Sequence, residues 1–144
     1  MATKGRPFTV RLSPEVERRL EEEAGMVRRP KTAMLETLAD EGLKMRRFPG
    51  IGFAGPEQDR RAYVIGTGLE VWEIVEIYRD HGEDEGSVLG AHPVTQRQLS
   101  TALAYHREHP EEVARHIRDN DRTVEEWQRL YPSLVPPRGE HTAG

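Results

Sequence analysis

The sequence predicts a mainly α-helical chain of two modules: a strand with two helices, then a small hairpin with a helix-turn-helix-like helical domain. Residues 7–12 alternate between apolar and other side chains and are followed by helical spacing. The charge balance changes near residue 50. Residues 1–50 carry eleven Lys and Arg against eight Asp and Glu, whereas residues 51–144 carry ten against seventeen. We place the modules at residues 1–48 and 49–131, and we expect disorder over residues 132–144.

The composition excludes several classes of protein. The chain has no cysteine, which excludes disulfides, thiol catalysis and thiolate-bound metals and fits a reducing cytoplasm. No apolar run approaches the length of a membrane span, so we expect a cytoplasmic protein with no membrane partner. A chain of 144 residues folds as one ordinary domain or two very small ones, and small modules often need a second copy to complete a core.

The strand predicted at residues 7–12 lacks a partner within its module. Its apolar side chains lie on one face: Phe8, Val10 and Leu12. Thr9 and Arg11 lie on the opposite face. Unpaired strand edges leave backbone donors and acceptors unmatched, and a second copy of the chain is the obvious partner. We therefore predict a homodimer joined by a two-stranded antiparallel ribbon, with the three apolar side chains in its core.

Two helices are predicted after this strand. Ser13 can cap the first, Pro14 suits the first helical position, and the helix ends near Gly25. Thr32 is the predicted cap of the second helix, which runs to about Arg47 with a broader apolar face.

This order of strand, Ser-Pro-Glu helix start, turn and second helix is similar to Arc/MetJ-type ribbon-helix-helix repressors, which bind DNA as intertwined dimers. The resemblance covers about a third of the chain and implies that the partner is duplex operator DNA. By position, six residues would contact the DNA. Thr9 and Arg11 would contact base edges, Lys4 and Arg6 the DNA backbone, and the amides of Lys31 and Thr32 a phosphate. A ribbon that serves dimerisation alone is the alternative.

The second module begins with a predicted hairpin that ends in a strand at residues 62–65. Gly66-Thr67-Gly68 reads as a turn because it lacks the lysine of a phosphate-binding loop, and a helix is expected over residues 69–81. A short helix near residues 87–90 follows. Thr95 and Gln98 then form a capping box ahead of another helix, which completes a helix-turn-helix-like arrangement.

Residues 63–71, 93–95 and 102–105 of this module together resemble a domain, formerly of unknown function, found in VapB-type antitoxins. The resemblance implies a neighbouring PIN-like ribonuclease toxin that the antitoxin neutralises. The acidic charge of residues 51–144 suits a basic partner protein, while a second DNA contact or dimer packing stays open as an alternative.

The C-terminal part has fewer signals. Pro110 interrupts the preceding helix, a helix restarts at residues 111–118, and Thr123 with Glu126 resembles another capping box. Core packing is the first interpretation of Trp127 and Tyr131, and contact with a partner protein is the second.

Catalytic, metal and cofactor sites are not predicted. Three histidines lie close in sequence, but they lack the spacing of a metal motif, and we interpret them as solvated: His106, His109 and His116. No nucleophile with an adjacent base is evident, so an enzyme is not expected.

Together the two resemblances imply an antitoxin of a type II toxin-antitoxin system. It would repress its own operon through the ribbon, associate with the nucleoid when bound to DNA, and neutralise a toxin through its C-terminal part. The alternative is a free-standing dimeric transcriptional regulator whose C-terminal domain serves oligomerisation or another interaction.

Overall fold

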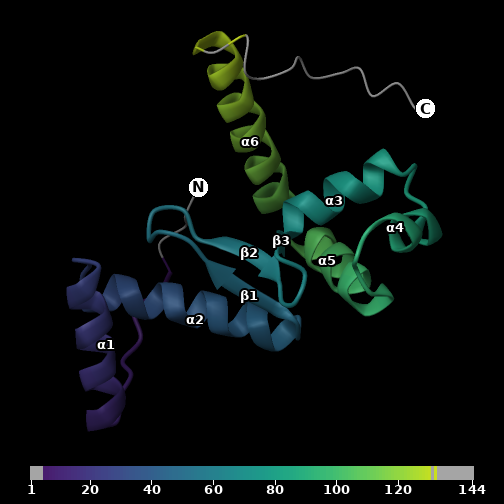
Figure 1. Ribbon diagram of the computed structural model, residues 1–144. Helices are drawn as coiled ribbons and strands as arrows, with labels where there is room; N and C mark the ends of the chain where they lie inside the picture. The colour runs from purple at the N-terminus through teal and green to yellow at the C-terminus, as the bar shows by residue number, and fades with distance from the viewer. Residues whose placement is uncertain (1–4, 131, 133–144) are drawn as a thin grey trace. The chain divides into compact units, whose positions relative to one another are not determined.

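The computed structural model describes residues 5–130 and 132, and the chain divides into two compact units, residues 1–44 and 45–144. The described part is mainly helical with a small antiparallel sheet, as predicted (Figure 1). The disorder expected in the C-terminal tail falls almost wholly outside the described residues.

The first helix of the N-terminal unit, α1 (Pro14–Met26), begins where the sequence predicts. The Ser13 hydroxyl accepts a hydrogen bond from the Val16 amide at 3.3 Å, and Pro14 occupies the first turn. Both features stabilise a helix start, because the first amides of a helix have no partners within it.

The second helix, α2 (Lys31–Arg47), starts two residues earlier than a Thr32 cap predicts. The Pro30 carbonyl already accepts a hydrogen bond from the Met34 amide at 3.0 Å, which places Thr32 inside the first turn. The expectation that Thr32 caps this helix is therefore wrong. The helix runs from the first unit into the second, since the division falls after Lys44.

Residues 5–13 precede α1 and form no strand within one chain. A lone strand has no backbone partners, so the predicted ribbon depends on a second copy and stays a prediction. The buried core of this unit consists of Leu20, Ala24 and Met34, with Leu12, Val27 and Leu35 packed against it.

The second unit opens with the predicted hairpin of β1 (Ile51–Ala54) and β2 (Arg61–Val64). A third strand, β3 (Leu69–Glu70), pairs with β2 where the sequence predicted the start of a helix. The turn explains the difference. The Thr67 hydroxyl donates to the Val64 carbonyl at 2.7 Å and accepts from the Leu69 amide at 2.9 Å, which folds the chain back along β2.

Four helices follow the sheet: α3 (Val71–Asp80), α4 (Glu85–Ala91), α5 (Gln96–Glu108) and α6 (Pro110–Leu130). The capping box at the start of α5 is confirmed. The Gln98 amide donates to Thr95 Oγ1 at 3.1 Å, and the Thr95 amide donates to Gln98 Oε1 at 2.9 Å. These helices and the sheet share one core, in which the largest fully buried side chains include Tyr105, Ile51, Ile74 and Leu99.

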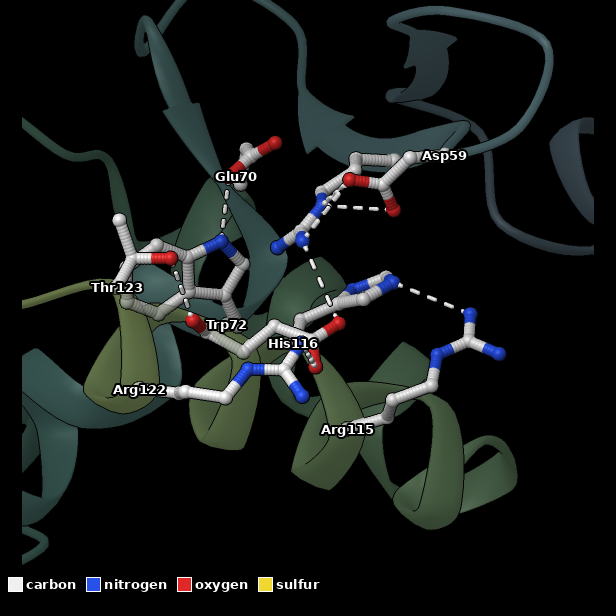
Figure 2. Close-up of polar contacts among 9 residues, drawn as sticks. Asp59, Glu70, Trp72, Arg115, His116, Arg122 and Thr123 are labelled. Carbon is white, nitrogen blue, oxygen red and sulfur yellow. Dashed lines mark hydrogen bonds and ion pairs between the residues drawn. The ribbon is translucent and has the colours of Figure 1, made fainter. Parts of the chain in front are cut away.

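The last helix, α6, continues through the position where a second capping box was expected. The Thr123 hydroxyl donates to the Asp119 carbonyl at 2.9 Å, as threonine does within a helix, so that expectation is wrong (Figure 2). The helix packs against α3 and α5, and its C-terminal half projects beyond them (Figure 1). None of the helices in the described residues is long and apolar enough to cross a membrane.

Candidate functional site

The N-terminal segment exposes apolar side chains that a folded monomer would ordinarily bury. Phe8 is 86% exposed and Val10 is 50% exposed, although both belong to the predicted dimer core. Arg6, Thr9 and Arg11 are exposed in the same segment, while Lys4 lies outside the described residues. The segment therefore offers both an uncovered apolar face and accessible basic side chains.

Beside this segment, the first unit contains a groove of about 410 Å³. Residues from the segment, α1 and α2 line it: Val10, Arg11, Leu12, Glu17, Leu20, Lys31, Thr32 and Leu35. The groove thus brings two predicted dimer-core residues together with the two residues predicted to hold a phosphate. Its apolar floor is suited to side chains from another chain.

The charges at the start of α2 are already partly balanced within the chain. Lys31 Nζ lies 3.0 Å from Glu17 Oε1 and 3.5 Å from Glu21 Oε1. The hydrogen bond and the charge of Glu17 raise the pKa of Lys31, with a smaller contribution from Glu21. A phosphate bound by the amides of residues 31 and 32 would share the ammonium group with Glu17. This makes Arg6 and Arg11 the stronger DNA-contact candidates.

The second unit holds a polar cluster between the hairpin and α6 (Figure 2). The side chain of Arg61 is only 15% exposed, and its guanidinium lies 3.1 Å from Asp59 and 3.7 Å from Asp119. Arg122 also approaches Asp119, at 3.7 Å. Arg61 therefore joins the sheet to α6 through Asp119, while Asp59 belongs to the same hairpin as Arg61.

His116 lies in this cluster and is only 2% exposed. Burial is the main cause that lowers its pKa, and the positive charge of Arg61 lowers the pKa further. The interpretation of His116 as a solvated residue is wrong. The sequence could have predicted this burial, because His116 lies three residues after the apolar residue Val113 on α6 and that spacing places both on one helix face.

The other two histidines of this group are half-buried, so they are only partly in solvent. The His109 ring contacts Tyr105 and Phe48, with centroids 4.7 and 5.9 Å away. Burial lowers the pKa of His106. Within the described residues, no group of three or more His, Asp or Glu side chains is placed to hold a metal ion.

Two surfaces of the second unit are candidates for contact with another protein. Trp127 is 52% exposed on α6, so its assignment to the core is wrong, while Tyr131 lies outside the described residues. A shallow groove of about 200 Å³ also lies between α3 and α6. Its lining is acidic and aromatic: Trp72, Glu73, Glu76, Ile77, Asp80 and Asn120.

Comparison with protein-family models, curated proteins and solved structures finds no match to this chain.

Proposed function

We propose that the protein is a homodimeric DNA-binding regulator in which residues 7–12 of two copies pair as an antiparallel ribbon. One observation carries the proposal: residues 5–13 before α1 form no strand within their own chain and expose Phe8 and Val10. Pairing with a second copy would satisfy the backbone groups and cover these side chains at the same time.

The size of the first unit supports the need for a partner. Among the described residues of this unit, the buried apolar core consists of Leu20, Ala24 and Met34, although the unit contains two helices. Burial of one large apolar side chain contributes about 1.5–3 kcal/mol, so three buried residues leave little margin over the entropy of ordering the chain. The same side chains from two copies would form a core of ordinary size.

The charge of the N-terminal segment supports duplex DNA as the ligand. Lys4, Arg6 and Arg11 occur within the first twelve residues, which contain no Asp or Glu. In a symmetric ribbon, Thr9 and Arg11 of both copies would lie on the face opposite the apolar core. A two-stranded ribbon fits the major groove, where such side chains contact base edges.

DNA binding is tested by fluorescence anisotropy with a duplex from the region upstream of this reading frame and an unrelated duplex of equal length. We expect tighter binding to the upstream duplex and an affinity that falls steeply with salt. Arg11→Ala should weaken binding by about 1–3 kcal/mol, or roughly 5- to 150-fold, if Arg11 contacts a guanine.

The matched control is Arg18→Ala, because Arg18 is exposed on α1 and paired with Glu22 at 2.6 Å. This variant should bind DNA as the unchanged protein does. Equal affinity of the Arg11→Ala variant and the unchanged protein for the upstream duplex would contradict base contact by Arg11. The absence of salt-sensitive binding to either duplex would contradict the DNA-binding proposal as a whole.

For the second unit we propose a protein-binding role, and specifically neutralisation of a ribonuclease toxin. The net negative charge of residues 51–144, the acidic groove between α3 and α6, and exposed Trp127 support a basic protein partner. The test is co-expression with the adjacent reading frame, followed by co-purification and an RNA-cleavage assay. Trp127→Ala should weaken the complex. If the neighbouring product neither binds nor cleaves RNA, the free-standing regulator is favoured.

A further inference from the structure

Two histidines of the second unit face each other across the connection between α3, α4 and α5. His81 directly follows α3, and His92 directly follows α4. Their Nε2 atoms lie 3.1 Å apart, and the rings are nearly perpendicular, with an interplanar angle of 89°. Both residues are half-buried. The two histidines are separated by eleven positions and are distinct from His106, His109 and His116, which lie close together in the sequence.

Backbone hydrogen bonds anchor both histidines at the ends of their helices. The His81 amide donates to the Ile77 carbonyl at 3.1 Å, and the His92 amide donates to the Val88 carbonyl at 2.9 Å. Each histidine therefore continues the hydrogen bonding of the helix before it. Such anchoring fixes the two Cα positions, which limits the movement of the rings to their side-chain torsions.

The separation of the nitrogen atoms matches that of two ligands on one metal ion. Imidazole nitrogen binds zinc at about 2.0–2.1 Å. At that bond length, two ligands lie about 2.9 Å apart in square-planar geometry and about 3.3 Å apart in tetrahedral geometry. The observed 3.1 Å falls between these two values.

We propose that His81 and His92 bind one divalent transition-metal ion through their Nε2 atoms, with water completing the coordination. In the metal-free pair, one Nε2 carries the proton shared between the rings. Metal binding requires that ring to hold its proton on Nδ1 instead, so that both Nε2 lone pairs point at the ion. The ion would join the end of α3 to the end of α4.

The ligand chemistry defines which ions bind. Imidazole suits copper, nickel and zinc, whereas magnesium and calcium require oxygen ligands. Affinity should therefore be highest for Cu²⁺ and lower for Ni²⁺ and Zn²⁺. Two protein ligands make a weaker site than the four of a structural zinc centre.

The ion would also act on the fold of this region. Within the described residues, α4 contributes one buried side chain to the core, Val88. A helix of seven residues with so few buried contacts is a weakly held element. Binding of an ion to the folded form alone raises stability by mass action, so saturating Zn²⁺ should raise the melting temperature.

The test is calorimetric titration of the full chain, free of any affinity tag, with CuCl₂, ZnCl₂ and MgCl₂. We expect the unchanged protein to bind one equivalent of Cu²⁺ per chain. The His81→Gln and His92→Gln variants should each bind Cu²⁺ at least tenfold more weakly. The double variant should bind Cu²⁺ about as weakly as either single variant, because one imidazole alone is a poor metal site. His106→Gln is the matched control and should titrate as the unchanged protein does.

Histidine NMR signals of the unchanged protein provide a measurement that does not depend on variants. The chain has six histidines. Zn²⁺ should shift the ring signals of His81 and His92 alone and reach saturation at one equivalent. The proposal would be overturned if the double variant took up as much metal as the unchanged protein, or if Zn²⁺ left the ring signals of His81 and His92 unshifted. The pair would then be a hydrogen bond only.

Discussion

Replacement of Phe8 by alanine tests the dimer directly, because this side chain contributes almost nothing to the single chain. Phe8 is 86% exposed, so its loss should leave the stability of the separate chain unchanged. In a ribbon dimer both copies of Phe8 would be buried, at about 1.5–3 kcal/mol each. The variant should therefore lose about 3–6 kcal/mol of dimer free energy, which corresponds to a roughly 10²- to 10⁴-fold higher dissociation constant.

Sedimentation-velocity runs over a concentration series measure this dissociation constant. Met26→Ala is the matched control, because Met26 is similarly exposed, at 78%, but lies at the end of α1 outside the predicted ribbon. The control should dimerise as the unchanged protein does. If Phe8→Ala and Met26→Ala have the same dissociation constant, or if the unchanged chain is monomeric, the ribbon proposal is refuted.

Two further predictions concern the second unit. Burial and Arg61 lower the pKa of His116 below 6.5, so protonation favours the unfolded chain. The stabilisation that neutral His116 contributes is present above pH 6.5 and is lost as the pH falls through the lowered pKa of His116. Denaturant titrations should therefore show that the free energy of unfolding of the His116→Gln variant depends less on pH over that range. Gly52→Ala should destabilise the hairpin by about 1–3 kcal/mol in thermal melts, because an added Cβ would lie 2.7 Å from the Tyr63 ring. Gly90→Ala, whose Cβ would meet no atom within 4 Å, should not destabilise α4; an equal loss in both variants would contradict the steric explanation.

Local chemistry explains which elements could be predicted from the sequence. Ser13 before Pro14, and Thr95 with Gln98, satisfy the free amides of the helices that they begin. These interactions span only three residues, so the sequence contains both partners. Thr123 and Glu126 have the same spacing, yet there the helix continues and the Thr123 hydroxyl donates to the Asp119 carbonyl within it. The spacing alone therefore does not distinguish a helix start from a helix interior.

The polar cluster was missed for a related reason. Arg61 and Asp119 are far apart in the sequence, and nothing near either residue predicts that the other lies 3.7 Å away. Burial of His116 likewise depends on the packing of α6 in this unit. Long-range pairing of this kind follows from the assembled fold.

The two units differ in what their own residues can bury. In the second unit, buried residues from the sheet and from α3, α4, α5 and α6 share one core. In the described part of the first unit only three apolar residues are buried, while Phe8 and Val10 remain exposed beside a groove lined by Leu12, Leu20 and Leu35. A chain that completes one core and leaves the other open is what the proposed dimer would require. The ribbon would then give the first unit its missing core and, by the same pairing, bring the two copies of Arg11 onto one face for DNA.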